Sequence, residues 1–171
     1  MAKKDKFTLT HKDADRHLLY QWSVQDPEQE VAFAVKQYKR RRGRSARVLR
    51  EDFCGTATVA CQWVASHPKR TAMGLDLDQS TLAWAREYNL SRLGKDSGRV
   101  DLRNTDVRTV TNPKADVVLA ENFSYYLLSE QSDLVGYFQT VRQSLKPDGI
   151  FILDCYGGWE SQQVMIERRT V

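Results

Sequence analysis

The chain has 171 residues, of which 41% are hydrophobic and 28% are charged, and its formal net charge is +4. This length is typical of one domain, and the composition supports a hydrophobic core and excludes a disordered chain. No window approaches the roughly 18 apolar residues of a membrane span. The first residues lack the apolar run of a secretory signal, so we expect a cytoplasmic protein.

The cysteines and histidines do not form a metal-binding pattern. Cys54, Cys61 and Cys155 are odd in number and contain no C-x-x-C pair, and the three histidines are scattered. The sequence therefore predicts neither a disulfide framework nor a metal site.

Residues 1–25 are expected to form a lead-in, and residues 26–171 one domain. In the lead-in, Tyr20 and Trp22 are expected to dock on the body of the domain. A helix is predicted to begin at Asp26-Pro27 and to end at Gly43, because these residues are typical of a helix cap, a first turn and a helix stop.

The following residues alternate between strand and helix patterns. The predicted elements are a strand at 48–52, a helix at 56–67, a strand at 71–77, a helix at 79–93, strands at 100–104 and 115–121, a helix from 132, a turn at 146–149 and a strand at 150–155. Residues 115–121 form a nearly continuous apolar run, which is typical of a strand covered on both faces. The pattern predicts an α/β fold, a three-layer α/β/α sandwich around a mostly parallel sheet.

A basic run lies between Lys36 and Arg50 and contains no acidic residue. We interpret it as a solvated helix end, where cations also suit the helix dipole, because no aromatic residue follows Tyr38 within the run. The alternative is a phosphate-binding surface on a non-catalytic RNA-binding protein.

The most informative feature is the turn after the first predicted strand together with the acid that ends the second. Gly55 and Asp76 are 21 residues apart, about the spacing at which nucleotide-binding α/β units place an acid on the ribose hydroxyls. A glycine in this turn lets the backbone approach a ligand, and the next helix offers free N–H groups. The pattern predicts an adenosine-containing cofactor.

The dinucleotide fingerprint is not complete. It requires glycines at 53 and 55 and a small residue at 58, whereas the chain has Phe53 and Thr58 beside Gly55. A pyrophosphate would find little room next to Phe53. An NAD(P)-binding oxidoreductase on a similar sheet is nevertheless kept as an alternative.

The segment Val48-Leu-Arg-Glu-Asp-Phe-Cys-Gly-Thr-Ala57 resembles motif I of the Rossmann-like class I S-adenosylmethionine-dependent methyltransferases. Glu51 stands in the acid position and Gly55 is the central glycine, while Phe53 and Ala57 replace the outer glycines. The sequence Arg-Glu-Asp-Phe-Cys-Gly-Thr at 50–56 is similar to motif I of one subgroup of this family. The resemblance, which extends over about residues 46–155, implies S-adenosylmethionine as cofactor and methyl transfer as activity.

The resemblance also implies which residues bind the cofactor. Asp76 and Leu77 match the segment that holds the ribose, and Asp106 and Val107 match the one that meets the adenine. The remaining implied contacts are Glu51, Phe53, Cys54, Gly55, Thr56 and Glu121.

Simpler roles remain open for several of these residues. Asp76 could cap the next helix, although Asp78 is better placed to do so. Asp106 could be an ordinary turn residue, and Glu51 could orient loop amides. We do not expect Cys54 to be a nucleophile, because no histidine accompanies it in sequence.

The methyl acceptor is expected above the end of the fourth strand. Asn122 can position it, Glu121 can serve as a base, and Phe123 or Tyr125 can stack on it or attract a cation. These rings could equally pack in the core. Asn122-Phe123 differs from the Asn-Pro-Pro-Tyr of many base-modifying relatives, so the acceptor could be a small molecule, an RNA base or a protein side chain.

Family members usually carry seven strands, of which the last two form a hairpin. The chain ends at Val171, shortly after the fifth predicted strand. We therefore expect a sheet without the last strands of the family fold and a chain that is a fragment of a longer protein. An exposed edge at the fifth strand would favour self-association.

Overall fold

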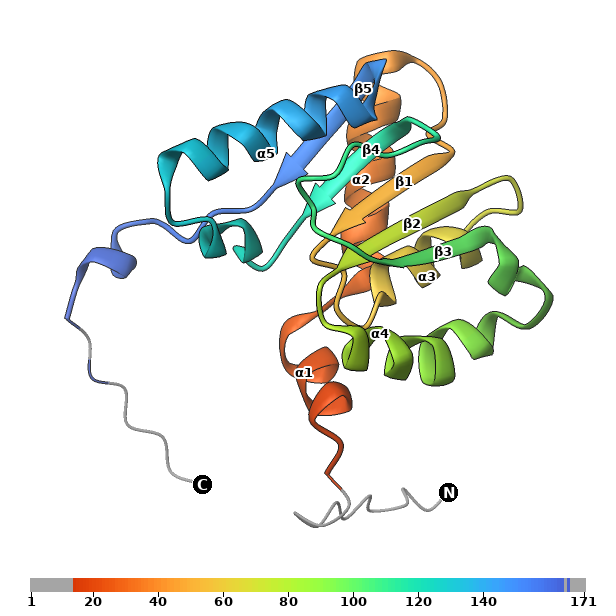
Figure 1. Ribbon diagram of the computed structural model, residues 1–171, viewed down its shortest axis with the longest axis horizontal. Helices are drawn as coiled ribbons and strands as arrows, with labels where there is room; N and C mark the ends of the chain where they lie inside the picture. Colours follow the sequence, from red (N-terminus) through yellow and green to blue (C-terminus); the bar gives the residue numbers. More distant parts are fainter. Residues whose placement is uncertain (1–13, 165, 167–171) are drawn as a thin grey trace, which may run out of the picture.

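The computed structural model describes residues 14–164 and 166, which form the α/β fold expected from the sequence (Figure 1). Five parallel strands make one sheet in the order β3-β2-β1-β4-β5. Their bounds are β1 Val48–Asp52, β2 Thr71–Asp76, β3 Val100–Asn104, β4 Ala115–Ala120 and β5 Leu145–Leu153. The strand order reverses between β1 and β4, and ligands of such sheets bind outside the carboxyl ends of the strands at this point.

Helices connect the strands and precede the first one. The longer ones are α1 Arg16–Val24, α2 Pro27–Arg42, α3 Thr58–Ala65, α4 Gln79–Ala85 and α5 Gln131–Ser144. Short π or 3-10 segments are η1 Arg86–Leu90, η2 Ser91–Arg99, η3 Ser124–Leu127 and η4 Glu160–Gln162. None of the helices in the described part of the chain is long and apolar enough to cross a membrane.

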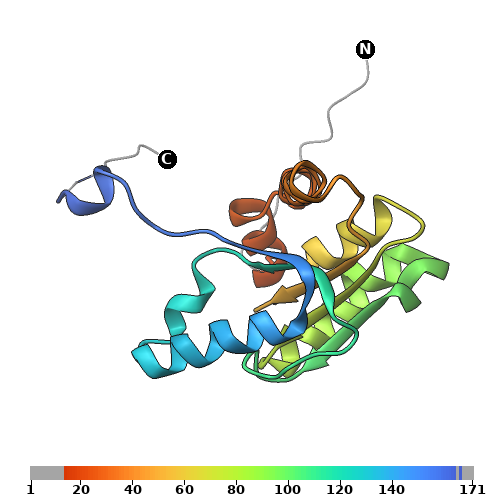
Figure 2. The same cartoon turned by 90° about the horizontal axis from the view of Figure 1, so that it is seen from above.

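Both faces of the sheet are covered, so the fold has three layers (Figure 2). Leu49 and Leu119 point to the face that α2, α3 and α4 cover, where they pack with Trp63. Val118 points to the opposite face, where Tyr137 of α5 covers it. Alternate side chains of one strand face opposite sides, so each central strand supplies both cores.

The ends of α2 agree with the prediction. The Asp26 side chain accepts a hydrogen bond from the Gln29 amide at 3.2 Å, and Pro27 stands at the first turn. Gly43 ends the helix with a left-handed φ of 68°, a conformation that a residue with a Cβ adopts only at a cost.

Two other elements differ from the sequence prediction. The helix predicted at 79–93 is α4 followed by η1 and η2, with a break at Gly94, whose φ is 54°. The predicted turn at 146–149 lies inside β5 as an irregularity, since Ala115 pairs with Leu145 but Val117 pairs with Ile150.

Of the two aromatic residues expected to dock the lead-in, Trp22 lies mainly in solvent and Tyr20 is half-buried. Trp22 is 62% exposed and Tyr20 is 44% exposed, whereas Asp15 at the start of α1 accepts a hydrogen bond from Trp84 Nε1 of α4 at 2.8 Å. The His17 ring lies 5.0 Å from the Trp84 ring. The prediction was wrong for Trp22, because the polar start of α1 rather than Trp22 contacts α4.

Candidate functional site

The loop after β1 has an unusual backbone. Phe53, Gly55 and Ala57 all have left-handed φ angles, at 54°, 49° and 56°. These are the positions at which the motif I pattern carries glycine. A side chain in this region costs on the order of 1–3 kcal/mol, so Phe53 and Ala57 hold strain that the surrounding contacts must offset.

Hydrogen bonds to β2 hold this loop in place. The Cys54 amide donates to the Leu75 carbonyl at 3.0 Å, and the Gly55 amide donates to Oδ2 of Asp76 at 2.8 Å. The glycine and the acid that the sequence analysis singled out are therefore in direct contact. These two hydrogen bonds hold the loop against the carboxyl end of β2.

Asp76 keeps the capacity to bind a ligand. Its Oδ1 accepts from the Asp78 amide at 2.8 Å, so each carboxylate oxygen makes one protein hydrogen bond and retains a further lone pair. Asp78 caps α4, since its side chain accepts from the Ser80 and Thr81 amides. Asp76 is thus free of the capping role.

A cavity of about 380 Å³ opens beside Asp76. Its walls combine apolar side chains with a few polar ones at the carboxyl ends of the strands. The lining residues are Phe53, Asp76, Leu77, Asp106, Val107, Arg108, Ser124, Leu127 and Leu128. Apolar walls with two carboxylates suit the planar base and the hydroxyls of an adenosine group.

Asp106 lies in this cavity but is paired. Arg108 Nη2 donates to its Oδ2 at 2.7 Å, and the Arg108 amide donates to its Oδ1 at 2.7 Å. The hydrogen bonds from Arg108 hold the pKa of the Asp106 carboxyl below its ordinary value. A ligand would therefore meet a carboxylate whose charge the Arg108 guanidinium already neutralises. Nη1 of the same guanidinium also pairs with Oδ1 of Asp133 at 2.8 Å.

Glu51 contacts the backbone of the next helix. It is buried, and its Oε2 accepts from the Ala60 amide in the first turn of α3 at 2.8 Å. Burial raises the pKa of Glu51 well above its ordinary value, although the Ala60 amide opposes this shift. Glu51 thus holds an amide of α3 and not one of the loop at 53–57, and its contact with a cofactor stays a prediction.

The thiol of Cys54 packs against β2. A Cβ at Gly74 would lie 2.8 Å from Cys54 Sγ, so the absence of a side chain at position 74 makes room for the thiol. Burial raises the pKa of Cys54 well above its ordinary value, the opposite of what a nucleophile needs. Beside it, Thr56 is buried and its Oγ1 has no hydrogen-bond partner among the described residues.

The sequence analysis missed a buried ion pair beneath the cavity. Arg50 Nε donates to Oδ1 of Asp52 at 2.6 Å, and both side chains are fully buried. Arg50 also donates to the carbonyls of Val107 and Thr109, so it fixes the loop that carries Asp106. The available signal was a pair of opposite charges two residues apart in a strand, which places both on one face.

The structure places the residues of the basic run at 36–50 in different surroundings. Arg50 is in the core, and Arg44 pairs with Asp148 at 2.6 Å and with Asp116 at 3.1 Å. Arg42 donates to the Asp148 carbonyl at 2.6 Å. The basic residues of 36–50 thus do not form one continuous phosphate-binding surface.

The segment after β4 has a second strained turn. Asn122 and Phe123 have left-handed φ angles of 57° and 55°. Their amides donate to Oδ2 and Oδ1 of Asp154, each at 2.9 Å. One carboxylate at the end of β5 therefore holds the turn that we expected to meet the acceptor.

The aromatic residues of this segment separate into two groups. Phe123 is 36% exposed, and its ring centroid lies 5.7 Å from that of Tyr156 and 6.1 Å from that of Tyr126. Tyr125 is buried in the core below Val118. Phe123 is therefore the accessible ring of the two predicted acceptor contacts, and Tyr125 fills the packing role.

Glu121 lies at the end of β4, partly buried. Burial, followed by a hydrogen bond and repulsion from Glu30, raises the pKa of Glu121 to about 8. Asp154 adds to the same shift. A glutamate with such a pKa can exchange a proton near neutral pH, as a general base requires.

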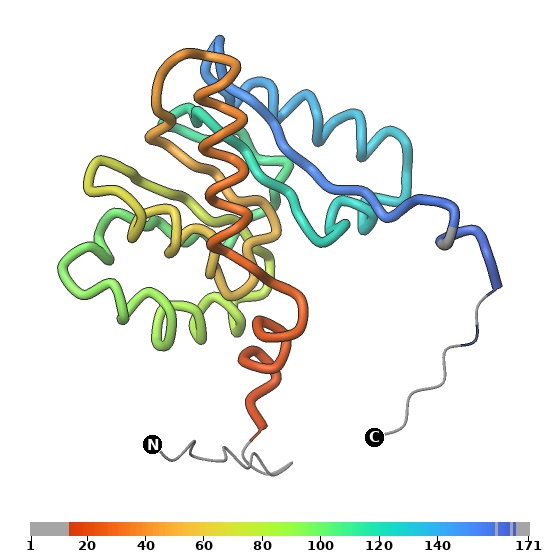
Figure 3. The backbone as a smooth tube through the Cα atoms, turned by 180° about the vertical axis from the view of Figure 1, so that it is seen from behind, coloured from red at the N-terminus to blue at the C-terminus, as the bar shows by residue number. Residues whose placement is uncertain are grey.

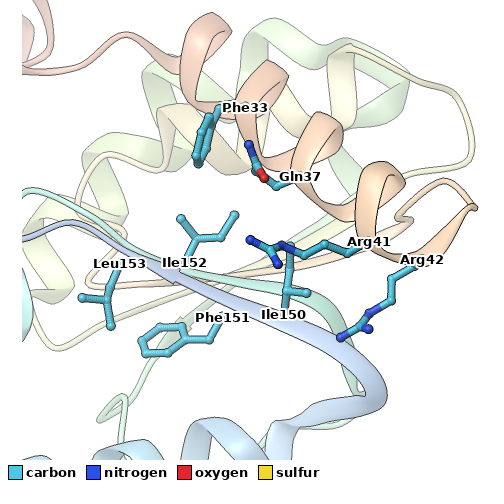
Figure 4. Close-up of a pocket in the computed structure, with 8 residues that line it drawn as sticks. All are labelled: Phe33, Gln37, Arg41, Arg42, Ile150, Phe151, Ile152 and Leu153. Carbon is cyan, nitrogen blue, oxygen red and sulfur yellow. The ribbon is translucent and has the colours of Figure 1, made fainter.

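A second hollow lies elsewhere, between α2 and the edge strand β5 (Figure 4). Its volume is about 540 Å³, and Phe33, Gln37 and Arg41 face Ile150 and Ile152 across it. It is larger than the cavity at Asp76, but none of the predicted cofactor residues lines it. We therefore assign the ligand site to the smaller cavity.

A family model described as "Methyltransferase domain" matches residues 54–151 of the chain. The chain belongs to this methyltransferase family. The matched range includes most of the motif I loop, Asp76, Asp106 and the turn after β4. No curated protein sequence matches the chain.

Solved structures share the fold, and those of MtfA and CalS10 are described as methyltransferases. The glycopeptide N-methyltransferase MtfA with S-adenosylmethionine has a TM-score of 0.64 at 21% identity, over 86% of this chain and 62% of that one. CalS10, an amino pentose methyltransferase from Micromonospora echinaspora, has a TM-score of 0.68 at 22% identity, over 84% of this chain and 57% of that one. DesVI from Streptomyces venezuelae has a TM-score of 0.70 at 21% identity, over 92% of this chain and 62% of that one. This methyltransferase domain thus spans about six-tenths of the length of these proteins.

Proposed function

We propose that this methyltransferase domain binds S-adenosylmethionine and transfers its methyl group to an acceptor above the end of β4. The observation that carries the proposal is the contact of Gly55 with Asp76 at the mouth of an apolar cavity. Family membership supports the same activity.

We assign the adenosine end of the cofactor to the cavity. Asp76 would accept from the ribose hydroxyls, with Leu77 beside it, while Asp106 and Val107 would meet the adenine. The methionine end would lie along the motif I loop, near Gly55, Thr56 and Glu121. The Thr56 hydroxyl, which has no partner among residues 14–164, fits a ligand with polar groups there.

The bound cofactor supplies a methyl group on a sulfonium, whose carbon–sulfur bond breaks as the acceptor attacks and whose sulfur keeps the electron pair. The protein provides orientation and excludes water. Asn122 positions the acceptor, the exposed face of Phe123 contacts it, and Glu121 receives its proton. The Asp154 carboxylate keeps this turn in the required conformation.

Four finer assignments accompany this function. The sequence of residues 50–56 supports membership in the subgroup with the Arg-Glu-Asp-Phe-Cys-Gly-Thr motif. Residues 26–171 are proposed as the catalytic domain. Buried free thiols at Cys54 and Cys61 suit a reducing cytoplasmic setting. The edge of β5, with half-buried apolar side chains, supports self-association.

The test is calorimetric titration with S-adenosylhomocysteine and, separately, with NADH. We expect micromolar binding of S-adenosylhomocysteine that is lost in Asp76→Ala, and no binding of NADH. Binding of NADH instead would favour an oxidoreductase. Absence of both, in a folded sample, would overturn the proposed function.

A further inference from the structure

A further hollow lies at the amino ends of β4 and β5 and shares no lining residue with the two cavities described above. Its volume is about 210 Å³. The lining residues are Lys114, Arg142, Leu145, Lys146, Pro147 and Gly149. Cationic side chains make up half of this lining, and none of the six residues is acidic.

The irregular start of β5, where residues 146–149 stand opposite Asp116 alone, forms one wall of the hollow. Extra residues in one strand of a pair bend that strand and redirect its side chains. Pro147 fixes the backbone within this segment. A Cβ at Gly149 would lie 2.7 Å from Cδ2 of Leu145, so the wall is closely packed.

A buried carboxylate holds Lys146 in place. Nζ of Lys146 lies 3.0 Å from Oδ2 of Asp116, whose side chain is fully buried in β4. Arg44 pairs with the other oxygen of Asp116 at 3.1 Å and with Asp148 at 2.6 Å. These two cations and two carboxylates form a group without net charge. An ammonium has three donors, so Lys146 keeps donors for a ligand while its position is fixed.

The positive charges of Lys114 and Arg142 are not balanced in this way. Both residues are exposed, and neither forms a salt bridge with any residue in 14–164. Lys114 directly precedes β4, and Arg142 lies in the last turn of α5. The end of the α5 dipole favours a cation at Arg142 but does not account for the two lysines. Three different segments thus bring cations to one hollow.

We propose that this hollow binds a phosphate monoester or a free phosphate ion. A phosphate monoester carries a charge of about −1.5 to −2 at pH 7, which matches the two unbalanced cations. The Arg142 guanidinium has paired N–H donors that suit phosphate oxygens, and the lysine ammonium groups bind phosphate as point charges. A phosphodiester has a single negative charge and matches this charge less well.

The hollow is remote from the cofactor cavity. Lys114 precedes β4 and Glu121 follows it, and a strand of six residues is about 20 Å long. The two sites therefore lie at opposite ends of the sheet, the hollow at the starts of the strand arrows and the cavity at their heads (Figure 1). Phosphate would be a second ligand, so this inference does not rest on the proposed function.

The experiment is an NMR titration of the ¹⁵N-labelled full chain with inorganic phosphate at about pH 8. Sodium chloride at equal ionic strength is the reference, because salt alone screens exposed charges. We expect the amide signals of Lys114, Lys146 and Gly149 to shift and to reach saturation with phosphate but not with chloride. The amide spectrum also reports whether each variant is folded.

Lys114→Gln and Arg142→Gln should each weaken phosphate binding by about ten- to hundredfold, because each removes a charge-assisted hydrogen bond. Lys69→Gln is the matched control. It removes an exposed lysine that precedes β2 at the same end of the sheet but does not line the hollow. Binding by this variant should change by less than about twofold.

Absence of saturable shifts in the unmodified chain would overturn the inference. Equal weakening in Lys69→Gln and Lys114→Gln would also overturn it, because binding would then depend on total charge rather than on the hollow. A single-stranded RNA oligonucleotide without terminal phosphates tests the ligand class. Tighter binding of this RNA than of phosphate, with shifts at the same amides, would overturn the assignment to a monoester.

Discussion

The Gly55 amide donates a hydrogen bond of 2.8 Å to Oδ2 of Asp76. This bond joins the loop after β1 to the end of β2 and orients the carboxylate toward the cavity. The same acid thus shapes the loop and offers its free lone pairs to a ligand. The two roles can be separated by substitution.

Asp76→Asn should weaken S-adenosylhomocysteine binding by about ten- to hundredfold, because a charged acceptor for the ribose hydroxyls is replaced by a neutral one. Calorimetry measures the change. Asp101→Asn alters an exposed acid on β3 that pairs with Arg103 and should leave binding unchanged. Similar losses in both variants would refute a ribose role for Asp76.

Gly55→Ala and Gly43→Ala should destabilise the chain by similar amounts, about 1–2 kcal/mol each, because both positions have positive φ and an added Cβ meets no other atom. Urea unfolding measures this loss. Only Gly55→Ala should also weaken S-adenosylhomocysteine binding, since Gly43 ends α2 away from the cavity. A binding loss in Gly43→Ala would show that the effect comes from stability alone.

Arg50→Met should lower the free energy of unfolding by about 3–5 kcal/mol, because Asp52 would remain buried without its partner. Arg47→Met, at an exposed position three residues earlier, should change it by less than about 0.5 kcal/mol. Denaturant unfolding measures the free energy of unfolding of both variants. A small effect at Arg50 would mean that the loop at Val107 does not depend on it.

The free energy of unfolding should fall as the pH rises from about 6 to about 8. The folded chain releases the Glu121 proton near pH 8, above the ordinary value of 4.5, because of burial and the nearby Glu30. Between these values the folded state binds more protons than the unfolded state, so stability declines with rising pH until the folded pKa is passed.

Glu121→Gln should flatten this decline, and the exposed control Glu28→Gln should not. Glu51, whose pKa is raised in the same direction, accounts for a remaining slope. Urea unfolding at several pH values measures the effect. A steeper decline in Glu121→Gln would contradict the assignment of the raised pKa.

Local patterns predicted the fold well. Asp26, Pro27 and Gly43 placed the ends of α2, and the apolar run at 115–121 predicted a buried strand, which the structure has at Ala115–Ala120. Such features depend on residues close in sequence. The break at Gly94 and the irregular start of β5 depend on tertiary packing, which periodicity does not report.

The candidate site was only partly predictable. The spacing of Gly55 and Asp76 pointed to two residues that the structure joins directly. The contacts of Glu30 with Glu121 and of Asp154 with Asn122 connect elements far apart in the chain. No motif in a single sequence encodes such pairs, and Arg50 was missed because a buried arginine resembles a member of a basic run.

The most direct test of the proposed cofactor site is an NMR titration of the uniformly ¹⁵N-labelled chain with S-adenosylhomocysteine. The amide signals of Gly55, Leu77 and Val107, around the cavity at Asp76, should shift, while those of Gln37, Arg41 and Ile152 in the groove beside β5 should stay unchanged. Shifts confined to the groove, or no shifts at all in a folded sample, would contradict the account.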